Sequence, residues 1–345
     1  MKLTILFIAK VLGLFEIASW LTRNRIRILG YHGIWFLDDH FGNFLYMDPE
    51  KFQARMTWLE QSKYSIISLG KAVDALHAKK TTPYSIVITI DDGWYGTYKY
   101  MLPVLEQKSL PATLYVYTEA VESQKPLFHI LISAILQLSN KTALKTDSTD
   151  VDSNKKFDVD ISSPSKKQEA LSDILRKLHT LDNVQAEEFC RDITVALGFD
   201  YESILESRQF SLMTFDEIQK ADQRGLDIQL HTHTHHVDID APEKIVDEIA
   251  INRKKLEPYV TSSLEHFCYP SGIHSLEMQR YLETNAVVSG TLCDTGLVTS
   301  GANLFELNRI LDGQQVSQLE FEGEISGFLE LTREMRNKFK RLIAS

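Results

Sequence analysis

The chain has 345 residues, of which 43% are hydrophobic and 24% are charged, and its formal net charge is -10. This length and composition are those of a globular protein that buries a sizeable core in one large α/β domain or two smaller ones. The negative net charge argues against a general nucleic-acid binder, which would carry a basic surface.

The first predicted element is an apolar run at residues 3–21, which Lys10 and Glu16 interrupt. These charges, and the lack of a small-residue cleavage site after the run, argue against a membrane span or a signal peptide. We interpret residues 1–25 as an amphipathic helix that lies in a membrane interface, or equally as a helix that packs on the outside of the fold. Lipid-attracting arginines follow the run directly: Arg23, Arg25 and Arg27.

Predicted strands and helices then alternate along the chain. Apolar, β-branched runs predict strands, and the stretches between them predict helices. This alternation is typical of a parallel sheet, either open or closed into a barrel. The predicted strands are 26–34, 64–69, 86–90 and 111–118, and the predicted helices are 49–62, 70–79 and 98–107.

The alternation then stops, and we expect a largely helical insertion over about 121–210 within one domain spanning 26–345. Residues 126–138 are apolar enough for a buried helix. The following stretch, 139–167, is polar and rich in Ser, Asp and Lys, which predicts a loop or disorder. Further helices are expected over about 168–197.

The rhythm resumes after the insertion and ends in a basic helix. Residues 318–343 are predicted to be helical, and their basic end is either a solvated face or a membrane-surface contact. The basic residues are Arg333, Arg336, Lys338, Lys340 and Arg341. The other elements are helices at 214–225 and 242–260 and strands at 226–236, 265–272, 286–292 and 305–310.

Two polar clusters follow predicted strands. Asp91 and Asp92 come directly after the strand 86–90, where two like charges repel and are expensive to desolvate. Four histidines lie at the end of the strand 226–236, although a single histidine there would be a hydrogen-bonded core residue. Carboxylates and imidazoles at the carboxyl ends of strands are typical of a divalent-metal site with open positions for water and substrate. The histidines are His231, His233, His235 and His236.

These clusters also carry a family resemblance. TIDDG at 89–93 resembles the TFDDG motif of the polysaccharide deacetylases, also called the NodB-homology or carbohydrate esterase 4 family. HTHTH at 231–235 is similar to their histidine motif, and FCYPSG at 267–272 is similar to their third motif. The resemblance extends over about 28–310, apart from the insertion. It implies a distorted (β/α)7-type barrel that hydrolyses the N-acetyl group of a sugar and releases acetate.

The resemblance assigns roles by position. Asp92, His231 and His235 would bind a divalent ion, with zinc as the expected metal, and Asp91 would be the general base that activates water. The backbone N–H of Ser271 would stabilise the oxyanion. The other two histidines would support the ligands or lie on the surface. Trp94 and Tyr95, next to the aspartates, would stack on a sugar ring or pack at the barrel rim.

The sequence departs from the family pattern in two places. Cys268 fills the slot of an arginine that orients the base, and no histidine fills the late position of the general acid. The late strand offers Asn308 and Arg309. Arg309 is a candidate catalytic residue that could stabilise charge, but it cannot release a proton near neutral pH. By their order in the chain, His32 and His274 are the candidate proton donors. A structural or surface histidine is the alternative for each.

These observations lead to a main hypothesis and two alternatives. We expect a metal-dependent hydrolase that removes N-acetyl groups from an N-acetylhexosamine-containing glycan or glycolipid precursor. The alternatives are a carbohydrate-binding pseudoenzyme with the same fold and an amide hydrolase acting on a small non-sugar substrate. No nucleic-acid partner is expected. The three cysteines are too few and too widely spaced for a disulfide framework, so we expect a cytoplasmic chain, peripheral at the membrane if residues 1–25 contact lipid.

Overall fold

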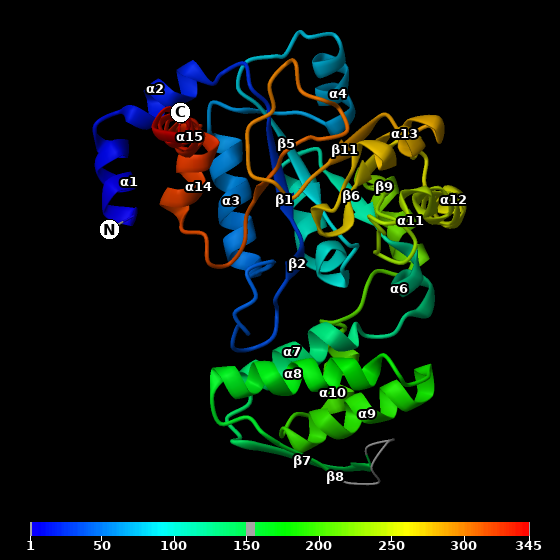
Figure 1. The fold of residues 1–345 in the computed structure, drawn as a ribbon. Coiled ribbons are helices and arrows are strands. Elements are labelled where there is room, and N and C mark those ends of the chain that lie inside the picture. Colours follow the sequence, from blue (N-terminus) through cyan, green and yellow to red (C-terminus); the bar gives the residue numbers. More distant parts are fainter. Residues whose placement is uncertain (1, 150–155, 345) are drawn as a thin grey trace. The chain divides into compact units, whose positions relative to one another are not determined.

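The computed structural model describes residues 2–149 and 156–344, and the chain forms two compact units (Figure 1). The barrel unit consists of Met1–Ile34, Phe44–Glu122 and Met213–Ser345. The inserted unit consists of Trp35–Asn43 and Ser123–Leu212. Chain segments before and after the inserted unit therefore build one common fold.

The barrel unit is built on a parallel sheet of eight strands. Seven strands follow one another in the order β11-β10-β9-β6-β5-β1-β12, and β4 pairs with the start of β5. Helices surround this sheet (Figure 1), so the predicted distorted (β/α) barrel is confirmed. The strands are β1 Arg27–Tyr31, β4 Ser65–Ile66, β5 Ser85–Ile90, β6 Thr113–Val116, β9 Asp227–Leu230, β10 His266–Cys268, β11 Ser289–Thr291 and β12 Ile310–Leu311.

The central strands are buried along their whole length. Every residue of β1 and β5 is buried, because helices cover a parallel sheet and leave neither face in water. The two strands pair in register from Arg27 opposite Ile86 to Tyr31 opposite Ile90. The residues that follow them therefore emerge side by side at the carboxyl edge of the sheet.

Amphipathic helices supply the outer layer of the barrel unit. Buried residues of α4, such as Leu69 and Leu76, pack against the sheet residues Ile28 and Val87. A short strand pair, β2 (Gly33–Ile34) with β3 (Tyr46–Met47), lies outside the main sheet. The helices are α3 Pro49–Gln61, α4 Leu69–His77, a π-helical turn Thr97–Met101 continued by α5 Leu102–Gln107, α6 Thr118–Ser123, α11 Phe215–Gln223, α12 Ile245–Leu256, α13 Leu276–Thr284, α14 Gln318–Ile325 and α15 Phe328–Ala344.

The N-terminal segment differs from the single helix predicted over residues 1–25. It forms two helices, α1 (Lys2–Val11) and α2 (Leu14–Leu21), with axes bent by 81°. Gly13, at the break, has a φ of 76°, a left-handed conformation that glycine adopts without steric cost. Among the described residues, no single helix has the length and apolar character to cross a bilayer. Only α1 and α2 together reach both, across the bend.

The inserted unit is mainly helical and contains one hairpin. The loop predicted over 139–167 is wrong in part, because β7 (Ala143–Thr149) and β8 (Lys156–Asp160) pair in antiparallel register. Leu144 is fully buried, as is Ile161 just after β8, so a few apolar side chains anchor a polar hairpin. Residues 150–155 lie outside the described residues. The helices are α7 Phe128–Leu138, α8 Pro164–Leu178, α9 Asn183–Ala196 and α10 Tyr201–Ser207.

Candidate active site

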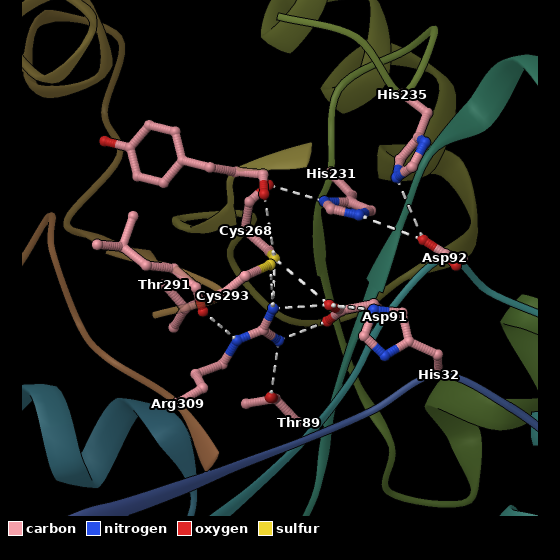
Figure 2. Close-up of polar contacts among 12 residues, drawn as sticks. His32, Thr89, Asp91, Asp92, His231, His235, Cys268, Thr291, Cys293 and Arg309 are labelled. Atoms are coloured by element: carbon pink, nitrogen blue, oxygen red, sulfur yellow. Dashed lines mark hydrogen bonds and ion pairs between the residues drawn. The ribbon is translucent and has the colours of Figure 1, made fainter. Parts of the chain in front are cut away.

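Polar side chains from several strands meet at the carboxyl edge of the sheet (Figure 2). His32 follows β1, and Asp91 and Asp92 follow β5; the Asp91 N–H donates to the Tyr31 carbonyl at 2.9 Å. His231 follows β9, so the predicted strand 226–236 ends before its histidines. This edge is where parallel α/β folds gather their functional residues.

Asp92, His231 and His235 form a cluster suited to a divalent ion. The Nε2 atoms of His231 and His235 lie 3.4 and 3.3 Å from Oδ1 of Asp92. Two ligands about 2.1 Å from a tetrahedral zinc ion are themselves about 3.4 Å apart, so these distances fit such an ion. Burial alone would raise the pKa of Asp92, but the two imidazoles outweigh it and hold this pKa well below its usual value.

Neighbouring groups hold the three ligands in place. Nδ1 of His231 donates to the Cys268 carbonyl at 2.7 Å, which directs Nε2 toward Asp92. The indole N–H of Trp94 donates to Oδ2 of Asp92 at 2.9 Å, so Oδ1 faces the histidines. Trp94 is buried and packs edge-on against Tyr46. Of the two predicted roles for Trp94, the structure therefore shows packing, together with an unforeseen hydrogen bond to a ligand.

Asp91 is held by a buried arginine. Nη1 and Nη2 of Arg309 donate to Oδ1 and Oδ2 of Asp91 at 2.6 and 2.7 Å, and both side chains are buried (Figure 2). Nε of Arg309 donates to the Leu292 carbonyl, and Nη1 also donates to Oγ1 of Thr89. Burial alone would raise the pKa of Asp91, but the charge of Arg309 outweighs it and lowers this pKa. Arg309 thus orients Asp91, the task that the family pattern gives to position 268.

A second set of donor atoms, from Asp91, His231 and Cys268, also lies within 4.8 Å of one another. It is less suited to a metal ion, because Arg309 already occupies both oxygens of Asp91. Burial also raises the pKa of the Cys268 thiol, which favours its protonated form. A metal-binding thiol must be a thiolate. The set of Asp92 and the two histidines is therefore the candidate metal centre.

His32 lies on the other side of Asp91. Its Nε2 is 3.3 Å from Oδ2 of Asp91, and its side chain is 11% exposed. Nδ1 is buried and has no hydrogen-bond partner among the described residues. Burial lowers the pKa of His32 despite the neighbouring carboxylates. The lowered pKa favours the neutral ring, whose Nε2 faces Asp91.

These residues line a cavity of about 270 Å³. Ser271 lies in its wall with a φ of 56°, and positive φ values also occur at Asp92 and His235. Such backbone strain at non-glycine residues concentrates at functional sites. The lining residues include His32, Phe44, Asp91, Asp92, His231, His235, Tyr269, Ser271 and Cys293.

The other predicted residues lie outside the cavity lining. His274 contacts the Gly272 carbonyl through Nδ1 and packs beside the ring of Tyr269. Nδ1 of His233 bonds to Oγ1 of Thr118 at 2.9 Å, and the His233 backbone N–H donates to Glu248. His233 therefore supports the loop that carries the two ligating histidines. The sequence singled out Arg309 and Trp94, but it predicted neither the contact of Arg309 with Asp91 nor that of Trp94 with Asp92.

The fold, and the side chains at the carboxyl edge of its sheet, place the chain among the parallel α/β barrels that carry a carboxylate pair with two imidazoles. A model of the polysaccharide deacetylase family matches residues 78–201 and 204–287, more than half of the chain. The chain belongs to this family.

Individual relatives agree with this assignment. YxkH of Bacillus subtilis (strain 168), assigned as a polysaccharide deacetylase, is 27% identical over 110 residues, which cover 31% of this chain and 38% of that protein. The deacetylase PplD of Streptococcus pyogenes, solved with acetate, has a TM-score of 0.58 at 15% identity, over 87% of this chain and 98% of its own. IcaB of Ammonifex degensii has a TM-score of 0.56 at 14% identity, over 88% of this chain and 97% of its own. At these identities, the two structures show the shared fold.

Proposed function

We propose that this chain is a metal-dependent N-deacetylase acting on an N-acetylhexosamine-containing glycan or glycolipid precursor. The supporting observation is the pairing of two adjacent aspartates with different partners: Asp92 faces two imidazoles, and Asp91 is held by Arg309. The nitrogen and oxygen donors suit zinc. Bound zinc would polarise the acetamide carbonyl and lower the pKa of a water molecule.

Asp91 is the proposed general base. Arg309 keeps its carboxylate ionised and fixes its orientation, so it can take a proton from the attacking water. The backbone N–H of Ser271, in the cavity wall, is the proposed donor to the oxyanion. One such donor contributes about 3 kcal/mol to lowering the barrier.

The leaving amine also needs a proton. The lowered pKa of His32 and its buried Nδ1 argue against the imidazolium acid that we considered from the sequence. We infer instead that Asp91 passes the proton taken from water to the amine. Nε2 of His32 lies 3.3 Å from Oδ2 of Asp91, and we infer that this contact keeps the carboxylate in position during both transfers.

Acetate release by the zinc-loaded chain tests the proposal. With N-acetylated glucosamine oligosaccharides, we expect acetate from the wild-type chain and about 10²–10⁴-fold less from the Asp91→Asn variant, which lacks the base. Zinc content should stay the same in this variant. The control is Asp92→Ala, which should lose zinc as well as acetate. Undiminished release by Asp91→Asn would remove Asp91 from the mechanism.

One observation favours a second candidate function, glycan binding without turnover. Among the described lining residues outside the proposed metal ligands, Asp91 alone remains suited to protonate the amine, because burial lowers the pKa of His32, raises that of Cys293 to about 11 and also raises that of Tyr269. No separate general acid therefore stands beside the base. If wild-type chain loaded with zinc binds the oligosaccharides by calorimetry but releases no acetate, this candidate replaces the deacetylase.

A further inference from the structure

We propose that the outer faces of α1 and α2, together with the second half of α15, form a docking surface for an anionic lipid bilayer. These helices belong to the barrel unit and pack together, α1 on α14 and α15 on α2 (Figure 1). The proposal rests on the surface polarity of these helices and is independent of the proposed chemistry.

In α1, the side that faces away from the barrel unit consists of apolar residues and not of the lysines. The inward side carries Leu6 and Ala9. Lys2 and Lys10 lie at the border of this side with side chains 67% and 49% exposed, and they pair with Glu320 at 2.8 Å and with Glu322. A helix packed on a water-soluble surface would direct its lysines outward. The outward side carries large apolar residues that are 48% to 68% exposed: Leu3, Ile5, Phe7, Ile8, Val11 and Leu12.

The apolar surface continues beyond the bend at Gly13. In α2, Phe15 and Ala18 are buried, whereas Ile17, Trp20 and Leu21 are more than half exposed. Phe15 joins Leu6 and Ala9 in a small core packed against Leu319, Phe328 and Leu329. The two helices are thus fixed to the barrel unit by their inner residues, and their exposed apolar residues remain available for a partner.

In the second half of α15, Met335 and Phe339 are 64% and 65% exposed. They alternate with exposed cations at Arg336, Lys338 and Lys340, whereas the side chain of Arg341 lies outside the described residues. Apolar side chains with interspersed cations are typical of helices that lie in a membrane interface.

Acidic groups on these helices are neutralised within the chain. Glu334 pairs with Arg25, and Glu324 and Glu330 both pair with Arg333. The exposed Glu16 of α2 pairs with Lys63, a residue of the same unit. Although the whole chain is acidic, this surface therefore presents free charge that is positive, which complements anionic headgroups.

Trp20 marks the edge of the apolar surface. Its ring is 57% exposed, and the guanidinium of Arg23 lies over it at 4.6 Å. Tryptophan and arginine are favoured at the level of lipid headgroups. The 81° bend between α1 and α2 is consistent with helices that lie along the interface.

Vesicle co-sedimentation of the full chain tests the proposal. We expect binding to vesicles of phosphatidylcholine with about one third phosphatidylglycerol, and weaker binding to pure phosphatidylcholine or at high salt. Phe7→Ser with Val11→Ser should weaken binding about tenfold or more, because both side chains face outward. The matched control, Leu276→Ser with Val184→Ser, removes exposed apolar side chains elsewhere and should change binding less than twofold.

A second readout locates the contact. Brominated lipid should quench tryptophan fluorescence in the wild-type chain, and Trp20→Phe should remove more of this quenching than Trp58→Phe, because Trp20 is exposed, Trp58 is partly buried, and Trp35 and Trp94 are buried. Absence of binding to anionic vesicles would overturn the proposal, as would binding that Phe7→Ser with Val11→Ser leaves unchanged. Self-association that this double variant abolishes, without vesicle binding, would instead assign the surface to a second copy of the chain.

Discussion

The guanidinium of Arg309 reaches Asp91 across 218 positions of sequence. It does so beside Gly30, where an added Cβ would lie 2.6 Å from Cδ2 of Leu311 and 3.4 Å from Nη1 of Arg309. A residue without a side chain thus leaves room for the arginine between β1 and β12. Cys268, which fills the family's arginine slot, contacts the same guanidinium at 3.2 Å. A positive charge beside Asp91 is therefore kept, although it comes from the residue just before β12.

Replacing Arg309 should change the pH dependence of activity. Asp91 acts as a base only when ionised, and Arg309 lowers its pKa. In Arg309→Gln, burial is no longer offset, so the pKa of Asp91 rises and activity is lost at a higher pH on the acid side. We expect kcat/KM profiles to show this shift, with partial recovery in Arg309→Lys, which keeps the charge. If kcat/KM falls at the same acidic pH in the wild-type chain and in both variants, the role of Arg309 is contradicted.

At the scale of elements, the bend at Gly13 determines the angle between α1 and α2. Its φ of 76° is costly for residues with a side chain, and nothing lies within 4 Å of an added Cβ. Any effect of a substitution there would come from the backbone and not from a clash.

Gly13→Ala should therefore destabilise the chain by about 1 kcal/mol, the cost of a left-handed alanine. The matched control is Gly301→Ala, where the added Cβ also meets nothing within 4 Å but the backbone is not left-handed. Urea denaturation should show a lower free energy of unfolding for Gly13→Ala and an unchanged one for Gly301→Ala. Equal midpoints would mean that α1 and α2 rearrange freely around the break.

Elements differ in how well the sequence predicts them. Asp91 and Asp92 directly follow the apolar run of β5, and His231 and His235 stand four positions apart after β9, so local patterns locate each group. The Arg309 contact depends on β12 pairing with β1, which no local pattern encodes. The sequence does not predict the β7–β8 hairpin, because these polar strands lack a clear alternation of apolar and polar residues. It does not predict the break between α1 and α2, because a single glycine gives little signal within an apolar run.

At the scale of the whole molecule, bound metal should stabilise the fold. The three proposed ligands follow β5 and β9, so an ion held between them links two parts of the sheet. An ion that binds only the folded chain stabilises it by about 2.7 kcal/mol at 100 times its dissociation constant.

Zinc should therefore raise the melting temperature of the metal-free chain by a few degrees, and a chelator should reverse the change. Differential scanning calorimetry is the measurement. The control is His236→Gln, which changes an exposed histidine of the same loop, leaves the three proposed ligands in place and should retain the rise, whereas His235→Ala should lose most of it. A rise that persists in His235→Ala would place the ion elsewhere.

The pairing of β12 with β1 also affects the order in which the site forms during translation. Asp91 and Arg309 lie 218 positions apart, so Asp91 leaves the exit tunnel before Arg309 is added, and the growing chain first carries this carboxylate without its guanidinium partner. Prematurely terminated chains that end before residue 309 would contain the aspartates and histidines yet leave the charge of Asp91 uncompensated. The orientation of Asp91 by Arg309 thus requires a chain that has been translated past residue 309.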